Sequence, residues 1–441
     1  MKPIHLQSTS LQFASYYNLE LQQIDVKGAY LNGKLEENVY MQQLEGFIEP
    51  GTKSLVCKLN KGIYRLKQLG WVWHQTLKHE LEKIGFKSGD ADTTIYCWFR
   101  DNGSIELIGW YVDDGLLAAN STKSMDHMVN DIWGSFDIQD LGELDCLLRI
   151  RISRNQDLRT IHISQPSFIN MIARRFNITP GRSITSLMDP SMNLQMAMNL
   201  DDNLDIPYTS LIGSINYCAV SVWPDISYAT NKCMQFTSQL NLSHWEAVKR
   251  IVWYLLHTRE FSILYKQDGN GIEGYAHNLA GYTDADFAGD INDRKSTTGW
   301  LFTFNGSLIS WASNKQGLVT RSSMESELIA GSFASTEGIW LIQLGKDFKH
   351  IFTPILLFTD NQSFMIFSKN DVNNNWTKHI NTHFHYAQDQ VMTGNIWLHY
   401  ISSIDNQANI LTKPLWPRKH AHLLNQLGVC FGTHQDFDVK V

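Results

Sequence analysis

Two adjacent carboxylates stand out in the first half of the chain. Asp113 and Asp114 follow Tyr111-Val112, and apolar residues lead into this tetrad from Ile105 and away from it to Ala119. Neighbouring aspartates repel each other, and both stay ionised at low cost only where solvent or a cation lies close. Carboxylates presented together are typical ligands of a divalent metal ion. The tetrad therefore indicates a metal site, and a solvated acidic turn on a surface hairpin is the alternative.

Two short β elements must position these acids. Asp-Asp-Gly is turn chemistry, so the stretch from Ile105 to Ala119 predicts a tight β-hairpin with the carboxylates at its tip. Upstream, Asp25 lies in a β-type run from Leu21 to Leu31 and heads the order Asp-Val-x-x-Ala-aromatic, which ends at Tyr30.

These motifs resemble those of reverse transcriptases in the form found in copia-type retrotransposons. The segment from Asp25 to Tyr30 resembles the first catalytic motif, and Tyr111 to Asp114 resembles the Tyr-x-Asp-Asp metal motif. A run from Cys57 to Tyr64, followed by Leu66-Lys67-Gln68 and Trp73, is also similar to the family and occurs in the same order. Order and spacing together are more specific than any one motif.

The resemblance implies an RNA-directed DNA polymerase that uses an RNA template and deoxynucleoside triphosphates. It implies that two Mg²⁺ ions, with Mn²⁺ as the alternative, are held by Asp25, Asp113 and Asp114. Tyr30 is expected to lie under the sugar and exclude a 2′-hydroxyl, and a core aromatic residue is its alternative interpretation. Gln68 is expected to contact the nucleotide or template, and Tyr111 completes the substrate-binding set.

A second set of motifs occupies the last third of the chain and resembles the ribonuclease H domain of copia-type polyproteins. These motifs are Gly281 to Asp286, Arg294 to Gly299, Ser322 to Glu327, Thr359 to Gln362 and Leu411 to Leu415. The resemblance implies that Asp284, Glu327 and Asp360 hold Mg²⁺ ions, which activate water against the RNA strand of an RNA–DNA hybrid.

Several nearby residues have more than one interpretation. Asp286 is the fallback for Asp284, because it lies two residues on along the same strand face. Glu325 is expected to cap a helix. Asn409 stands where the family has a fourth acid, and its amide offers a neutral oxygen in place of a charge. A zinc site is the competing interpretation of His379, His383 and His385.

The predicted fold class is α+β, with a reverse-transcriptase palm and thumb-like domain followed by a ribonuclease-H-like α/β domain. The expected regions are residues 1–178 for palm and thumb without the fingers, 179–274 for a linker and connection-like helical region, 275–416 for the ribonuclease-H-like domain and 417–441 for a tail. The local patterns predict helices at 1–19, 71–84, 121–136, 166–175, 208–240, 243–258 and 322–344. They also predict strand pairs at 144–153 with 160–164 and at 300–304 with 307–312.

The bulk composition sets limits on the class of protein. A chain of 441 residues with 43% hydrophobic residues is long enough for two or three domains with their own cores. Six scattered cysteines without paired spacing indicate reduced thiols in an intracellular protein. The resemblance implies a cytoplasmic particle or the nucleus as its location. No run of eighteen apolar residues occurs, so no membrane span is expected. The net charge of −7 is unfavourable for a polyanion, which would need a local basic track.

Several departures from the family lead us to expect impaired polymerase activity. The chain begins at the palm, so the fingers with their cationic clamp on the triphosphate are expected to be missing, together with other polyprotein segments. Arg65 and Arg149 replace family glycines, Leu69 to Trp73 departs from the family order, and Trp223 replaces an arginine before Pro-Asp. The alternatives are a catalytically weak relic that only binds nucleic acid, and a hybrid nuclease whose palm is structural.

Overall fold

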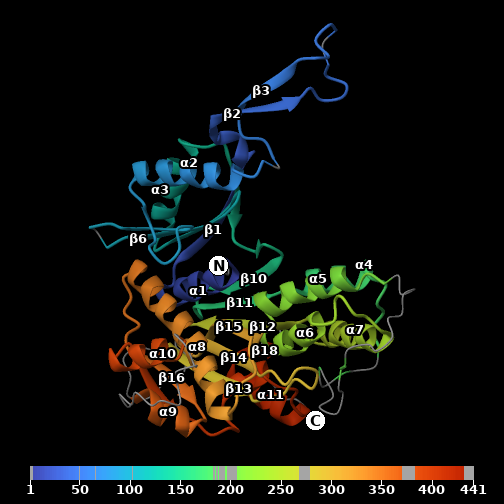
Figure 1. The fold of residues 1–441 in the computed structure, drawn as a ribbon. Coiled ribbons are helices and arrows are strands. Elements are labelled where there is room, and N and C mark those ends of the chain that lie inside the picture. The colour runs from blue at the N-terminus through green and yellow to red at the C-terminus, as the bar shows by residue number, and fades with distance from the viewer. Residues whose placement is uncertain are drawn as a thin grey trace. The chain divides into compact units, whose positions relative to one another are not determined.

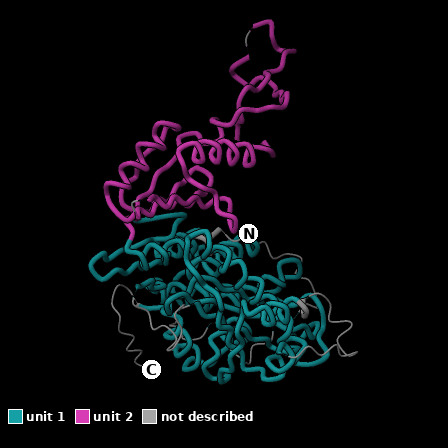
Figure 2. The backbone as a smooth tube through the Cα atoms, turned by 90° about the vertical axis from the view of Figure 1, so that its left-hand side faces the viewer, with its two compact units in different colours: residues 1–18, 145–441 teal, residues 19–144 magenta. Residues whose placement is uncertain are grey.

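The computed structural model describes residues 3–48, 50–64, 66–101, 103–181, 184, 187, 194–195, 206–267, 279–369 and 383–431. The chain divides into two compact units, shown in different colours in Figure 2. Unit 1 comprises residues 1–18 and 145–441, and unit 2 comprises residues 19–144. Most of residues 179–205, the first part of the expected linker and connection-like region, lies outside the described residues. Among the described helices, none has the length and apolar character that crossing a bilayer requires.

Unit 2 is built on a six-stranded sheet in the order β4-β5-β6-β7-β1-β8. Its strands are β1 (Glu20–Val26), β4 (Lys87–Ser88), β5 (Ile95–Phe99), β6 (Ile105–Tyr111), β7 (Asp114–Ala119) and β8 (Ile138–Glu143). The helices α2 (Leu69–Ile84) and α3 (Thr122–Trp133) bury apolar side chains such as Trp73, Leu81 and Met128 in the core of this unit. The short helix η1 (Ala29–Asn32) and the two-stranded sheet of β2 (Lys34–Gln42) and β3 (Val56–Lys61) complete the unit.

The predicted hairpin at 105–119 is present, but its turn is one step earlier than the Asp-Gly pattern suggested. Tyr111 pairs with Asp114, so Val112 and Asp113 form the two-residue loop, and Gly115 lies within β7. A Cβ atom at Gly115 would meet Ile24 Cγ1 at 2.8 Å and the Trp110 ring at 3.0 Å. Glycine is therefore needed here for close packing inside the sheet and not for the turn.

Unit 1 contains the ribonuclease-H-like sheet, in the order β15-β14-β13-β16-β17. Its strands are β13 (Leu279–Asp286), β14 (Thr297–Phe304), β15 (Ser307–Lys315), β16 (Ile355–Thr359) and β17 (Ile396–Tyr400). β13, β14 and β15 are antiparallel, whereas β13, β16 and β17 run parallel. The predicted Asn305-Gly306 turn joins β14 to β15 with φ values of 54° and 75°, as a primed turn requires.

One long helix, α8 (Ser323–Asp347), contacts β13 and β14 of this sheet (Figure 1). It begins as predicted at Ser322, whose side chain accepts a hydrogen bond from the Glu325 backbone N–H at 3.2 Å, and it continues three residues beyond Leu344. The shorter helices α9 (Gln362–Lys369) and α10 (His383–Met392) pack beside it.

A second sheet of unit 1 joins stretches that the sequence assigned to three different regions. Its order is β18-β12-β11-β10-β9, and its strands are β9 (Cys146–Leu147), β10 (Ile150–Asn155), β11 (Thr160–Ser164), β12 (Phe261–Lys266) and β18 (Val429–Phe431). The N-terminal helix α1 (Pro3–Tyr17) contacts β12 and β15. The compact units therefore do not end at 178, 274 and 416, where the sequence analysis placed its boundaries.

The remaining helices of unit 1 are α4 (Pro166–Arg175), α5 (Tyr208–Ser221), η2 (Pro224–Ile226), α6 (Ser227–Met234), α7 (Leu242–His257), η3 (Gln407–Leu411) and α11 (Pro417–Gln426). The single helix expected at 208–240 is wrong, because Pro224 interrupts it and proline disfavours helical backbone in the preceding residue. The Ser243-x-x-Glu246 pattern also predicts a capping box at the start of the next helix, and this prediction is wrong. Asn241 caps α7 instead, in a reciprocal pair of hydrogen bonds with His244.

Candidate active site

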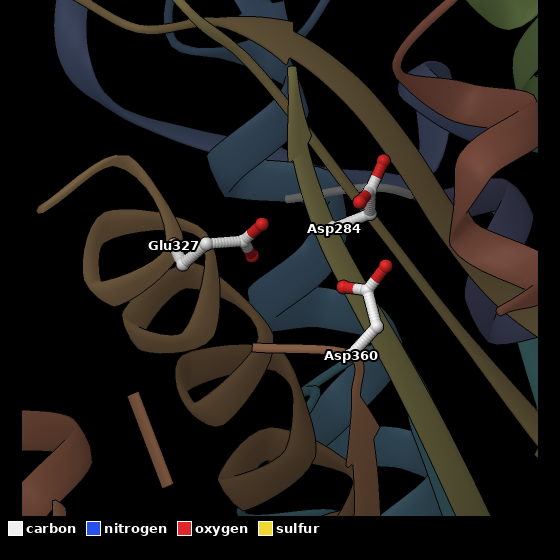
Figure 3. A group of neighbouring side chains, drawn as sticks. All are labelled: Asp284, Glu327 and Asp360. Atoms are coloured by element: carbon white, nitrogen blue, oxygen red, sulfur yellow. The ribbon is translucent and has the colours of Figure 1, made fainter. Parts of the chain in front are cut away.

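Three acids from separate elements of unit 1 converge as the sequence analysis expected. Asp284 lies on β13, Glu327 lies one turn into α8, and Asp360 follows the end of β16. One carboxylate oxygen from each lies within 4.8 Å of the others, and Figure 3 shows the three carboxyl groups facing a common space. Because β13 and β16 are parallel neighbours, their carboxyl ends bring Asp284 and Asp360 to the same edge of the sheet.

The electrostatics of this group suit a bound cation. Burial raises the pKa of Glu327 well above its ordinary value, and the nearby charges of Asp284 and Asp360 raise it further. Glu327 Oε2 is buried and has no hydrogen-bond partner. A buried carboxylate oxygen without a partner is costly, and a metal ion would satisfy it. The three acids therefore fit a divalent metal ion, which oxygen ligands favour.

Two further residues contact Asp284 and were given no role by the sequence analysis. The Thr412 hydroxyl donates a short hydrogen bond to Asp284 Oδ2, and Lys413 Nζ lies 3.2 Å from the same oxygen. Both residues belong to the Leu411 to Leu415 motif, so the motif itself was the available signal. Its sequence position, over a hundred residues from Asp284, gave no indication of this contact.

The other candidates near this site lie apart from the three acids. Asp286 is at the end of β13, and burial raises the pKa of its carboxyl; it does not belong to the group of three. Glu325 serves the start of α8 as expected, because its Oε2 accepts from the Arg321 backbone N–H at 2.6 Å. The Asn409 amide nitrogen donates to the carbonyls of Ser403 and Asn406 at 2.7 and 2.8 Å, and its oxygen is buried without a partner.

The histidines proposed for zinc cannot be placed as ligands. His379 lies outside the described residues, and so do the side chains of His383 and His385 at the start of α10.

The three acids of unit 2 lie at the end of the β1–β7 pairing. Asp25 on β1 pairs directly with Asp114 on β7, and the Val26 backbone N–H donates to the Asp113 carbonyl at 2.9 Å. Burial raises the pKa of Asp25, and the charge of Asp113 adds to this increase. Burial also raises the pKa of Asp114, although a hydrogen bond from Gln23 at 3.1 Å opposes the shift. Among the described residues, the one group of three acidic side chains whose oxygens converge in this way is that of unit 1.

The turn that carries Asp113 is held by two buried tryptophans. Val112 has a φ of 57°, a backbone conformation that β-branched residues rarely adopt. Its carbonyl accepts hydrogen bonds from Trp73 Nε1 at 2.5 Å and from Trp110 Nε1 at 2.9 Å. Trp73 was noted in the sequence only as a family marker, and the structure adds this contact.

The expected substrate-binding residues of unit 2 lie on different elements. Tyr30 is half-buried in η1, and its ring meets that of Tyr64 edge-on with centroids 4.9 Å apart. Gln68 precedes α2, donates to Glu37 Oε2 at 3.3 Å and lines a cavity of about 660 Å³. Tyr111 ends β6 with 39% of its surface exposed.

Comparison with known proteins agrees with the motifs. A model of the reverse transcriptase (RNA-dependent DNA polymerase) family matches residues 4–189. The retrovirus-related Pol polyprotein from transposon TNT 1-94 of Nicotiana tabacum is 34% identical over 95% of this chain and 31% of its own length. The corresponding polyprotein from transposon RE1 of Arabidopsis thaliana is 32% identical over 93% of this chain and 27% of its own length.

The chain thus spans less than a third of the length of these relatives. The solved structure of a foamy viral protease–reverse transcriptase in complex with dsDNA aligns with 87% of this chain and with 68% of its own chain. The sequence identity is 11%, and the TM-score is 0.21. That structural likeness is too weak to guide interpretation. The family match and the sequence identity across most of the chain show that it belongs to the copia-type retrotransposon Pol polyproteins.

Proposed function

We propose that this chain is the RNA-directed DNA polymerase and ribonuclease H part of such a polyprotein, and that hybrid cleavage is the activity its geometry supports best. The observation that carries this proposal is the convergence of Asp284, Glu327 and Asp360 within 4.8 Å. The same family membership supports an RNA template, an RNA–DNA hybrid and deoxynucleoside triphosphates as partners.

In the ribonuclease site, the chain's own residues supply a fixed set of oxygens. The Thr412 hydroxyl and Lys413 orient Asp284, and the Ala285 backbone N–H holds one side of the Glu327 carboxylate. A bound Mg²⁺ or Mn²⁺ ion would activate water and stabilise the leaving oxygen. The A-like shape and 2′-hydroxyls of RNA would decide which strand of the hybrid lies against these oxygens.

Hybrid cleavage tests this proposal directly. Purified chain should cut the RNA strand of an RNA–DNA hybrid in Mg²⁺, and EDTA should stop the reaction. Asp360→Asn should lower the rate at least about a hundredfold, because one of the three charges that attract the ion is lost. Asp157→Asn, in an exposed turn between β10 and β11, is the matched control and should retain the full rate. An unchanged rate for Asp360→Asn would contradict the proposal.

Polymerisation is the second candidate function, favoured by the pairing of Asp25 with Asp114 beside the Val112 turn. Primer extension on an RNA template should depend on Mg²⁺ and be lost in Asp113→Asn, while Asp360→Asn should still extend. Hybrid cleavage without extension would instead indicate a nuclease with a structural palm. Neither activity, with nucleic-acid binding retained, would indicate a catalytically weak relic.

A further inference from the structure

Lys413 is placed against the acid cluster by a segment that is anchored to the sheet at several points. The Asn406 amide donates to the Thr283 carbonyl on β13 at 2.9 Å, and Thr412 is fully buried with its hydroxyl on Asp284 Oδ2. Gly299, which pairs with Asp284 across β13 and β14, has no side chain to keep this segment away. A Cβ atom there would meet Thr412 Cγ2 at 2.6 Å. The position of Lys413 is therefore set by buried packing.

The two oxygens of the Asp284 carboxylate have different contacts. Oδ2 accepts from the Thr412 hydroxyl and faces Lys413 Nζ at 3.2 Å, and the Asp284 side chain is only 3% exposed. A carboxylate that bridges two ions uses one oxygen for each of them. With Oδ2 already in contact with a hydroxyl and an ammonium, Asp284 has Oδ1 left for a metal ion.

The charges of the cluster also indicate that it binds one metal ion. Asp284, Glu327 and Asp360 carry three negative charges when ionised, and the amide of Asn409 stands where the family has a fourth acid. Counting only these three acids and Lys413, one ammonium and one divalent ion balance three carboxylates, whereas two divalent ions would leave a net positive charge. The charges of Asp286 and Lys419, which also act on this cluster, are opposite in sign. Lysine provides a compact positive charge suited to this place.

We propose that Lys413 is a built-in cation of this site, which takes the place of a second metal ion, so that the cluster binds one divalent ion in the absence of nucleic acid. This inference rests on the proposed ribonuclease function and deepens it. Lys413 acts as a positioning residue through its contact with Asp284.

Counting bound Mn²⁺ by electron paramagnetic resonance tests the proposal on the full chain. Asp25, Asp113 and Asp114 are first replaced by Asn, so that every tightly bound ion belongs to the unit 1 cluster. We expect one Mn²⁺ per chain in this parent and two after Lys413→Met. Lys413→Arg, which keeps the charge, should leave the count at one.

Lys346→Met is the matched control, because it lies on α8 nineteen residues from Glu327, about 28 Å along the helix axis. It should bind one ion, and circular dichroism should confirm that all variants are folded. Two ions in the parent, or a count of one that Lys413→Met does not change, would overturn the inference. One ion with no hybrid cleavage would instead count against the ribonuclease function while leaving the role of Lys413 standing.

Discussion

At the scale of single residues, the Val112 turn shows how neighbouring side chains hold an unfavourable backbone conformation. Val112 adopts a φ of 57°, and such a strained residue persists only where its surroundings fix it. The indole N–H groups of Trp73 and Trp110 both donate to the Val112 carbonyl. These two hydrogen bonds fix the peptide that presents Asp113 beside Asp25 and Asp114.

Removing these donors should destabilise unit 2. Trp73→Phe should lower the free energy of unfolding by at least about 1 kcal/mol, because the hydrogen bond from the buried Trp73 indole to the Val112 carbonyl is lost. Trp71→Phe, on the same helix but with the Trp71 side chain 65% exposed, should have little effect. Urea denaturation of the two variants provides the measurement.

The double variant Trp73→Phe with Trp110→Phe makes the test more specific. Because either donor alone can still satisfy the Val112 carbonyl, losing both should cost more than the sum of the single losses. Strictly additive losses, or an equal loss in Trp71→Phe, would show that the shared carbonyl is not what the tryptophans stabilise.

At the scale of elements, α11 is anchored through a buried polar group. His420 on this helix lies 3.6 Å from Asp225 Oδ2, and the Tyr254 hydroxyl on α7 donates to the same oxygen at 2.5 Å. Asp225 belongs to the Trp223-Pro224-Asp225 stretch that the sequence analysis noted only for its departure from the family. The structure thus gives this stretch a role in holding α11 against α7.

This anchor should make stability depend on pH. Burial lowers the pKa of His420 below its ordinary value of 6.5. Between the folded pKa and the unfolded pKa of 6.5, His420 binds a proton in the unfolded chain but stays neutral in the folded chain. The contribution of His420 is therefore present above pH 6.5 and is lost as the pH falls through its lower folded pKa. Urea unfolding at pH 7.5 and 5.5 should show a smaller loss of stability in His420→Gln than in the unsubstituted chain.

His422→Gln is the matched control on the same helix, because the His422 side chain is 49% exposed. It should lose as much stability at low pH as the unsubstituted chain. The same loss in His420→Gln would refute a role for His420 in the pH dependence.

Local patterns predicted the elements well and their junctions less well. The Asn305-Gly306 turn, the cap at Ser322 and the strands around Asp25 follow from residue preferences that act over a few positions. The displaced hairpin turn at Val112 does not, because packing of Gly115 against Ile24 and Trp110 decides it. Arg149 was noted as a replaced glycine, and it indeed has a positive φ of 65°.

At the scale of the whole molecule, distant segments share one core. α1 belongs to the same compact unit as residues 145–441, and Phe13 on this helix is fully buried. Its ring lies 4.4 Å from that of Phe348 and 5.4 Å from that of Phe304. Sequence patterns did not predict this, since contacts over hundreds of residues leave no local signal; the acids of unit 1 were located only because the family motifs named them.

Truncating Phe13 should therefore weaken the unit that holds Asp284, Glu327 and Asp360. Phe13→Ala should cost about 3–5 kcal/mol, the usual range for removing a buried phenylalanine side chain. The thermal transition of this unit can be identified, because Mg²⁺ should shift it in the unsubstituted chain but not in Asp360→Asn. Phe13→Ala should move this transition to lower temperature. Phe47→Ala, at a side chain 81% exposed, should leave it in place, and a Phe13→Ala transition at the original temperature would contradict the shared core.

Both proposals require that Asp284, Glu327 and Asp360 together bind a divalent metal ion. Crystals of the chain grown with Mn²⁺ and measured near the manganese absorption edge test it most directly. We expect an anomalous peak within coordination distance of all three carboxylates and no such peak in crystals of Asp360→Asn. A well-ordered cluster without such a peak, at Mn²⁺ concentrations that support hybrid cleavage, would contradict it.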